Sequence, residues 1–308
     1  MEKSGIIVKG VGGLYTVDCG GELVECRARG HFRHERITPS AGDFVTLEDG
    51  GEGSETSWAI ARIGERSSLM IRPPLANLGA IYIGAAAAKP DPVMLTIDKM
   101  TVIAENCGIT PYIVITKGEL APALAADIEK TYSLAGIKTF VTSSENGDGI
   151  GELREFVRRR GGERISAFAG ASGVGKSTLM NALFPELSLQ TGEISHRIER
   201  GKNTTRSVEL FPCGETEDGG RRYIADTPGF SLLDFIRYDF LKKDELVYAF
   251  REFAPYLGHC RYTRCTHLCE DGCAVVEAVN GGKISKSRHE SYVTLYNELK
   301  TKHEWDKR

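Results

Sequence analysis

One stretch of the chain restricts its fold more than any other. Residues Gly170–Ser177 read G-A-S-G-V-G-K-S and match the phosphate-binding loop pattern G-x-x-x-x-G-K-S. An apolar segment, 164–169, precedes the loop like a buried strand, and 178–184 follows it like a helix. Such glycines let backbone N–H groups curl around an anion, and a helix N-terminus adds partial positive charge. The pattern therefore predicts a strand–loop–helix unit that binds a nucleotide.

The motif assigns a role to the residues of this loop. Lys176 is expected to contact the β- and γ-phosphates, and Ser177 to ligate Mg²⁺. A glycine-rich turn that matches by chance is the alternative, and the flanking strand and helix patterns argue against it. The expected nucleotide-binding residues of the loop are Gly170, Ala171, Ser172, Gly173, Val174, Gly175, Lys176, Ser177 and Thr178.

Two later segments have the composition of nucleotide-sensing switches. Asp226-Thr227-Pro228-Gly229 follows an expected strand, where an aspartate orients Mg²⁺ through water and the Gly229 N–H meets the γ-phosphate. Thr204 and Thr205 lie between this segment and the loop, and both are candidates to ligate Mg²⁺. A basic, solvated loop is the alternative for the threonine pair. The expected catalytic residues are Lys176, Ser177, Thr204, Thr205, Asp226 and Gly229.

Two short segments before the loop have the form of base-recognition elements. Thr116-Lys117-Gly118-Glu119 resembles the N/T-K-x-D element, in which an acid accepts hydrogen bonds from guanine and the lysine stem covers the base. Val141–Ser144 resembles the S-A-K loop and adds Ser143 and Ser144 to the candidates. Ordinary strand-end turns are the alternative. Because ordinary GTPases place these elements after the D-x-x-G, the order found here predicts a circularly permuted domain.

The rest of the chain divides by its pattern. Short strands separated by glycine turns fill residues 5 to 70 and predict a five-stranded OB-fold barrel. Strands alternate with helices from residue 80 to 225, which predicts a mostly parallel, doubly wound sheet. Helical segments are expected at 241–250 and after Ser287-Arg288-His289-Glu290, which has capping-box spacing. Arg72-Pro73-Pro74 is expected to be a linker.

A basic segment in the barrel is a candidate RNA contact. Arg27, Arg29, Arg33 and Arg36 surround Phe32, so that charge and an aromatic ring lie together. A loop that is basic without binding RNA is the alternative.

Four residues have the spacing of a metal site. Cys260, Cys265, His267 and Cys273 form C-x4-C-x-H-x5-C, which suits one closed, tetrahedral, structural Zn²⁺. Cys269 and His259 lie near enough in sequence to compete as ligands. Four unrelated buried side chains are the alternative.

Composition excludes a membrane protein and leaves a soluble one. The 308 residues carry a net charge of −3, with 41% hydrophobic and 26% charged residues. No apolar run approaches a membrane span, and residues 1–5 do not resemble a signal peptide. We therefore expect a cytoplasmic protein with reduced thiols, no membrane partner and a monomeric state.

Together, these features resemble the RsgA family, also called YjeQ or YloQ. The phosphate loop, D-T-P-G-F at 226–230 and the Cys/His spacing carry the resemblance, which covers nearly the whole chain. It implies an RNA-binding OB-fold barrel at 1–71, a circularly permuted P-loop GTPase at 72–237 and an α-helical zinc domain at 238–308. It also implies a GTPase that binds the small ribosomal subunit late in assembly, contacts its rRNA through the barrel and the zinc domain, and is stimulated by the subunit.

The chain departs from the family pattern at three places, which fits a divergent paralogue. Glu119 stands in place of Asp, Asn203 in place of a His that often precedes the threonine pair, and Asn77-Leu78-Gly79 in place of N-V-D. Phe230 occupies the position of a water-orienting glutamine, so we expect weak intrinsic hydrolysis. Two other functions stay open: a non-catalytic or slow nucleotide-regulated RNA-binding module, and a permuted NTPase with relaxed base specificity.

Overall fold

The computed structural model describes residues 2–51, 56–71, 74–159, 163–187, 208–226 and 241–301. The chain forms two compact units, each assembled from three separate stretches. The first comprises Met1–Ile81, Glu152–Ala169 and Met180–Phe230, and the second comprises Tyr82–Gly151, Gly170–Leu179 and Ser231–Arg308. In the described ranges, no helix is both long and apolar enough to cross a membrane.

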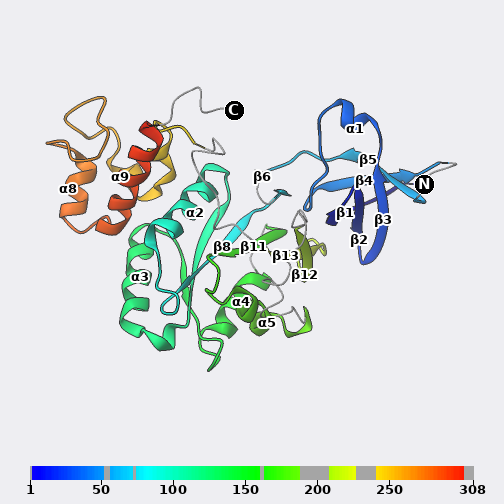
Figure 1. The fold of residues 1–308 in the computed structure, drawn as a ribbon, viewed down its shortest axis with the longest axis horizontal. Coiled ribbons are helices and arrows are strands. Elements are labelled where there is room, and N and C mark those ends of the chain that lie inside the picture. The colour runs from blue at the N-terminus through cyan, green and yellow to red at the C-terminus, as the bar shows by residue number, and fades with distance from the viewer. Residues whose placement is uncertain are drawn as a thin grey trace. The chain divides into compact units, whose positions relative to one another are not determined.

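The first unit begins with a closed barrel, drawn in blue in Figure 1. Its strands follow the order β1–β2–β3–β5–β4, and β4 pairs back to β1. Only β3 and β5 pair in parallel. This topology confirms the expected OB-fold. The strands are β1 (Glu2–Val11), β2 (Leu14–Cys19), β3 (Glu22–Ala28), β4 (Phe44–Asp49) and β5 (Trp58–Ile63), and helix α1 (His31–His34) lies between β3 and β4.

The barrel core contains Phe32, the aromatic ring that the sequence suggested as an RNA contact. Phe32 is 4% exposed and packs among Ile7, Leu47 and Ile60. The expectation that this ring stacks on bases is therefore wrong, because α1 turns Phe32 inward while its basic neighbours stay outside. Arg29 pairs with Glu48 at 2.8 Å, whereas Arg33 and Arg36 are exposed.

Three further strands continue the barrel within the same unit. They are β11 (Ile165–Gly170), β12 (Glu209–Glu215) and β13 (Arg221–Asp226). β11 and β13 are parallel, β12 is antiparallel to β13, and β12 pairs with β1. The buried carboxylate of Asp18 on β2 accepts hydrogen bonds from the Tyr223 hydroxyl at 3.0 Å and from the Arg221 guanidinium at 3.3 Å. Barrel and strand β13 are thus joined by polar contacts to one buried carboxylate.

Shorter elements complete the first unit. Helices α4 (Ile150–Arg159) and α5 (Lys176–Leu183), whose first residues belong to the second unit, agree with the expected helices. The 3-10 helix η2 (Pro185–Leu187) follows where Pro185 was expected to end the helix. Strands β6 (Leu69–Ile71) and β7 (Pro74–Ala76) pair as a small antiparallel sheet. Pro74 therefore belongs to a strand, although the sequence suggested a linker.

The second unit contains the strands and helices that carry the base-recognition segments. Strands β8 (Ala80–Ala86), β9 (Thr110–Thr116) and β10 (Thr139–Val141) lie side by side in the order β10–β9–β8, with β9 and β10 parallel. Every residue of β8 is buried. Helices α2 (Met94–Asn106) and α3 (Pro122–Leu134) and the 3-10 helix η1 (Gly118–Leu120) connect the strands, as the alternating pattern predicts.

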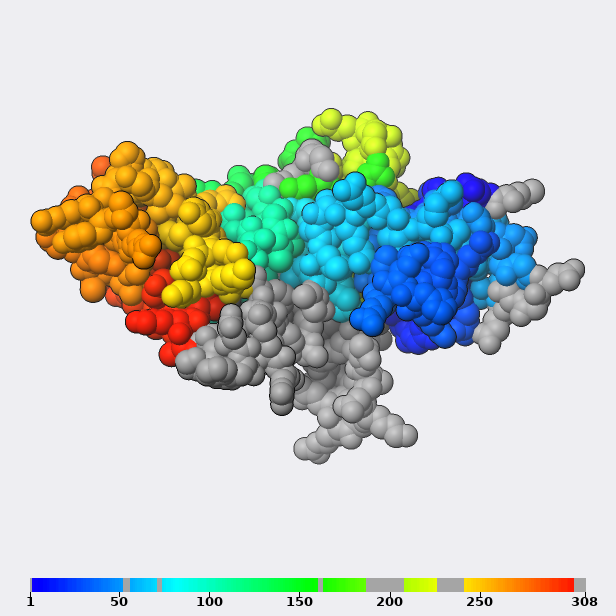
Figure 2. Space-filling view, turned by 90° about the horizontal axis from the view of Figure 1, so that it is seen from above, coloured from blue at the N-terminus to red at the C-terminus, as the bar shows by residue number. Residues whose placement is uncertain are grey.

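The C-terminal part of this unit is helical and differs from the sequence pattern in two details. It contains η5 (Leu246–Ala249), η6 (Arg251–Tyr256), α8 (Ala274–Asn280) and α9 (Lys286–Lys300). The region expected as a helix at 241–250 is instead a turn followed by the 3-10 helix η5. In Figure 2, residues 241–250 are drawn in yellow and adjoin the Cys/His segment, residues 260–273, in orange. Helix α9 starts at Lys286 after Ser285, so the capping box expected at Ser287 and Glu290 is wrong.

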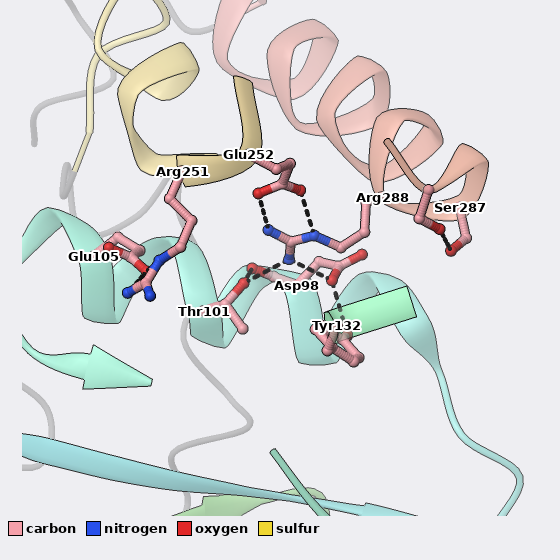
Figure 3. Close-up of polar contacts among 9 residues, drawn as sticks. Asp98, Thr101, Glu105, Tyr132, Arg251, Glu252, Ser287 and Arg288 are labelled. Atoms are coloured by element: carbon pink, nitrogen blue, oxygen red, sulfur yellow. Dashed lines mark hydrogen bonds and ion pairs between the residues drawn. The ribbon is translucent and has the colours of Figure 1, made fainter. Parts of the chain in front are cut away.

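A buried ionic cluster attaches α9 to α2 (Figure 3). The Arg288 side chain is 1% exposed and donates to Glu252 on η6 at 2.8 and 3.1 Å. It also donates to Asp98 and Thr101 on α2, at 2.8 and 2.9 Å. The Tyr132 hydroxyl donates to Asp98 at 2.8 Å. One arginine thus links α2, η6 and α9.

Candidate functional site

The phosphate loop has the backbone that an anion site requires. It leaves β11 at Gly170 and enters α5 at Lys176, so the N–H groups of the first helical turn are free of partners within the helix. Gly170 has a φ of 145°, and a Cβ there would lie 2.8 Å from the Gly84 carbonyl oxygen. Only glycine fits this position. The expected strand–loop–helix unit is therefore present.

The Lys176 ammonium lies across this loop. It donates to the carbonyl oxygens of Gly170 at 2.8 Å and Ala171 at 3.1 Å. These contacts hold the positive charge over the concave side of the loop, where phosphate oxygens are expected to bind. Ser177 follows at the first turn of α5, half-buried, as the motif requires of a Mg²⁺ ligand.

The residues of the first base-recognition segment contact the phosphate loop directly. The Thr116 hydroxyl donates to the Val174 carbonyl at 2.6 Å in a buried contact. Lys117 has a left-handed backbone with φ 56°, and its ammonium donates to the Gly173 carbonyl at 3.1 Å and to the Lys89 carbonyl. Residues separated by more than fifty positions in the chain are thus brought into one site, as the permuted order predicts.

Glu119 lies on η1, two residues after Lys117, with one carboxylate oxygen left without a partner. Its Oε2 atom is buried and accepts no hydrogen bond from the residues that the structure describes. Buried polar atoms in folded proteins are nearly always hydrogen-bonded, so this oxygen has the character of a ligand acceptor. An N–H donor, such as the N1–H or exocyclic amine that the sequence pattern assigns to guanine, would satisfy it.

The second base-recognition segment forms a tight loop after β10. The Ser143 side chain is buried, and its hydroxyl accepts from the N–H groups of Glu145 and Asn146, both at 3.3 Å. Ser143 therefore shapes the loop, whereas Ser144 is exposed. Gly149 closes the loop at φ 69°, where a Cβ would lie 2.1 Å from the Val141 carbonyl oxygen.

Several expected site residues lie outside the described residues. Thr204, Thr205, Gly229, Asn203 and Phe230 belong to this group, and the side chain of Asp226 does as well. The backbone of Asp226 ends strand β13, the position that the sequence pattern assigned to it.

The Cys/His segment forms a compact donor set. The ligand atoms of Cys260, Cys265, His267 and Cys273 all lie within 4.8 Å of one another. The Cys260 and Cys273 sulfurs are 3.9 Å apart, and Nδ1 of His267 lies 3.5 and 3.4 Å from them. Tetrahedral Zn²⁺ with Zn–S bonds of about 2.3 Å places its sulfurs roughly 3.8 Å apart. Three thiols and one imidazole at these distances fit one structural Zn²⁺ site.

The competing ligands are excluded from this cluster by their positions. Cys269 and His259 are exposed, and neither belongs to the group. Burial lowers the pKa of His267, so the imidazole stays neutral, which is the form that binds a metal.

The sequence reasoning missed the residue that shapes the turn between the ligands. The Glu270 carboxylate accepts from the N–H groups of Thr266 at 2.7 Å, Leu268 at 2.9 Å and Cys269 at 3.2 Å. Burial acts to raise its pKa, but the Thr266 hydroxyl and these backbone donors lower it to about 2. The sequence signal that could have identified Glu270 is an acidic residue inside the Cys/His segment that does not occupy a ligand position.

Two family models match the chain. One, described as RsgA GTPase, matches residues 63–236, and the other, described as RsgA N-terminal domain, matches residues 4–54. A protein of Caldanaerobacter subterraneus subsp. tengcongensis named small ribosomal subunit biogenesis GTPase RsgA is 38% identical over 98% of both chains. A protein of Geobacillus kaustophilus with the same name is 40% identical over 96% of this chain and 97% of its own.

Two solved structures are similar over nearly the whole chain. The crystal structure of YjeQ from Thermotoga maritima gives a TM-score of 0.79 at 32% identity, over 98% of this chain and 100% of that one. The crystal structure of YloQ, described as a circularly permuted GTPase, gives a TM-score of 0.74 at 31% identity. That match covers 98% of this chain and 96% of the YloQ chain.

Proposed function

The chain belongs to the RsgA GTPase family, and from this premise we propose that it hydrolyses GTP as a late maturation factor of the small ribosomal subunit. The subunit stimulates hydrolysis, and the protein is released afterwards. The observation that carries the proposal is the set of hydrogen bonds that join Thr116 and Lys117 to the phosphate loop. Glu119 follows on η1 with a buried oxygen that has no partner among the described residues. A phosphate site and a base site are thereby combined.

Different residues of the site are proposed to bind the phosphates, the base and Mg²⁺. Loop N–H groups and Lys176 hold the phosphates and stabilise the charge that develops on them. The Lys117 stem covers the base, and Glu119 accepts its N–H groups. Ser177, a switch threonine and Asp226 would hold Mg²⁺, which supplies charge neutralisation at the β- and γ-phosphates when bound. Thr204 and Thr205 remain the threonine candidates.

The domains have separate roles in this proposal. Residues 1–71 form the barrel that contacts rRNA, residues 72–237 form the permuted GTPase, and residues 238–308 form the zinc domain, which also contacts rRNA. Zn²⁺ would be held by Cys260, Cys265, His267 and Cys273 and would stabilise a segment with little apolar content. We place the protein in the cytoplasm because its proposed partner is the small ribosomal subunit, and we propose that it acts as a monomer.

The test is GTP turnover with and without purified small subunits. We expect slow turnover by the protein alone, a marked rise with subunits, and loss of both rates in Lys176→Ala. Turnover that small subunits leave unchanged would overturn the assembly role. A Lys176→Ala variant that loses nucleotide but keeps its cellular role would favour the non-catalytic RNA-binding module.

A further inference from the structure

Two tyrosines of the C-terminal part are unusually exposed and lie in the same groove. Tyr248 is 73% exposed and Tyr262 is 51% exposed. Single exposed apolar side chains are common on protein surfaces and need no explanation. These two rings, from η5 and from the turn between Cys260 and Cys265, line one groove of about 720 Å³. Their convergence points to a ligand with flat, apolar faces.

The floor of the groove is rigid. Tyr292 of α9 is 1% exposed, and its hydroxyl donates to the Thr266 carbonyl at 2.8 Å. Its ring packs edge-on against Phe250 and Phe253, with centroids 5.3 and 5.0 Å apart. Cys260, Cys265 and His267 of the metal cluster line the same groove. A preformed floor lowers the ordering cost of binding.

Two cations and one acid line the groove. Lys243 and Arg264 line it and are exposed, and the only acid in the lining is Asp244. Within the described residues, neither Lys243 nor Arg264 has an ion-pair partner. The Arg261 guanidinium lies 5.6 Å from the Tyr262 ring centre and also pairs with Asp271 at 3.1 Å. Among the described lining residues, Lys243 and Arg264 are therefore the side chains that can contact anionic groups such as phosphates.

We propose that this groove binds unpaired RNA nucleotides, with bases stacked on Tyr248 and Tyr262 and phosphates beside Lys243 and Arg264. Exposed aromatic rings and cations in one channel are the elements that recognise single strands without sequence preference. Duplex RNA does not fit, because its bases are stacked on each other and present no free face. The inference deepens the proposed function, since it names the form of RNA that the C-terminal part contacts.

Binding of a fluorescein-labelled, unstructured RNA of about ten nucleotides to the full chain, followed by anisotropy, tests the stacking. We expect Tyr248→Leu and Tyr262→Leu each to weaken binding roughly 5- to 100-fold, the range that corresponds to about 1–3 kcal/mol of stacking per base. Tyr248→Phe and Tyr262→Phe should bind like the parent chain, because they keep the ring. Leu134→Ala, at an exposed apolar residue of α3 outside the groove, is the matched control for a lost surface side chain.

A second measurement locates the contact, since the barrel is also proposed to bind RNA. The same RNA with 4-thiouridine is photo-crosslinked, and the attached peptides are identified by mass spectrometry. We expect crosslinks on peptides that contain Tyr248 or Tyr262. Leucine variants that bind as tightly as phenylalanine variants, or crosslinks confined to the barrel, would overturn the proposal.

Three outcomes separate the failure of this inference from the failure of the proposed function. If small subunits stimulate turnover but the tyrosine variants bind RNA normally, only the groove assignment fails. If the tyrosine variants lose small-subunit binding yet keep their RNA affinity, the groove takes a protein partner and the RNA proposal is overturned. Groove-dependent RNA binding without any stimulation of turnover would leave the groove assignment standing and overturn the assembly role.

Discussion

At the scale of single residues, the nucleotide site depends on a few polar atoms. Lys117 adopts a left-handed backbone, rare for a residue with a side chain, and in this conformation its ammonium contacts the carbonyls of Gly173 and Lys89. Glu119 follows on the short η1 helix with a buried carboxylate oxygen. Glutamate is one methylene longer than the aspartate of the family pattern, which changes where the carboxylate lies. Base selectivity is therefore the property to measure first.

We predict that Glu119→Gln removes most of the preference for GTP over ATP. A hydrogen bond to a charged group contributes about 1.5–3 kcal/mol, so GTP affinity should fall roughly 10- to 100-fold while ATP affinity changes little. Competition against a fluorescent GDP analogue measures both affinities. Glu129→Gln, an exposed carboxylate on α3, is the control. Unchanged discrimination in Glu119→Gln would show that this carboxylate does not read the base.

Arg288 offers a second test at the residue scale. Its replacement by methionine leaves Asp98 and Glu252 buried without their cation, and one Asp98 oxygen already lacks a partner among the described residues. Breaking such a buried pair costs about 3–5 kcal/mol. We expect a large fall in the urea midpoint of Arg288→Met, measured by circular dichroism.

The matched control for Arg288→Met is Lys99→Met, because Lys99 also links α2 to α9. Lys99 pairs with Glu298 at 2.9 Å, but both side chains are about a quarter or more exposed. Partly exposed pairs contribute roughly 0–1 kcal/mol, so the midpoint should move little. Equal effects of the two variants would contradict a special role for the buried cluster.

At the scale of elements, the metal-binding turn is held by its own polar contacts as well as by its ligands. The Glu270 carboxylate accepts from the backbone N–H groups of Thr266, Leu268 and Cys269, on both sides of His267. The Nε2 atom of His289 lies 2.8 Å from the His267 carbonyl oxygen. These contacts bring the ligands together in a segment without regular secondary structure. Hydrogen bonds therefore position the four candidate ligands, and a bound metal would add to this stabilisation.

Thiol labelling at pH 8 tests this arrangement. Burial raises the pKa of Cys26 and Cys213 to about 12, so only about 10⁻⁴ of each is thiolate at pH 8, and both should label slowly and faster as pH rises. Exposed Cys269 should label first. A chelator that removes Zn²⁺ should then make Cys260, Cys265 and Cys273 reactive. Mass spectrometry of iodoacetamide-treated protein measures this order, and rapid labelling of those three before chelation would contradict the zinc site.

At the scale of the whole molecule, helix α1 and the residues after it place two exposed cations on the surface of the barrel. Its core is closed by five strands, and Phe32 fixes α1 from inside. Arg33 and Arg36 stay exposed and have no ion-pair partner among the described side chains. The barrel therefore presents cations without an aromatic platform, which suits contacts to the phosphate backbone of RNA.

We predict that the double variant Arg33→Gln, Arg36→Gln binds the small subunit more weakly and that its affinity depends less steeply on salt concentration. Each lost phosphate contact should reduce the slope of log affinity against log salt by about 0.7–0.9. Binding measured by sedimentation at several salt concentrations gives this slope. Arg62→Gln, which removes an exposed cation paired with Glu2 on β1, is the control. An unchanged slope in the double variant would exclude α1 from the RNA contact.

The sequence predicted much of this protein because several of its constraints are local. A phosphate loop needs glycine at Gly170 and a cation at Lys176, and these requirements are visible without the fold. The spacing of Cys260, Cys265, His267 and Cys273 likewise encodes a metal site in a short segment. Most barrel strands follow from alternation between turns. Starts of 3-10 helices and caps, such as Ser285 rather than Ser287, are not encoded by spacing alone.

The sequence by itself determined most of the elements and pointed to the loop residues and the four candidate metal ligands, since each depends on residues close together in the chain. Only the tertiary structure decided that Phe32 is core, that Glu119 keeps an oxygen with no partner among the described residues, and that Tyr248 and Tyr262 share a groove. It also decided that Arg288 finds Asp98 and Glu252. Burial and partner choice depend on residues far apart in sequence, and no local pattern of residue types specifies which of them meet.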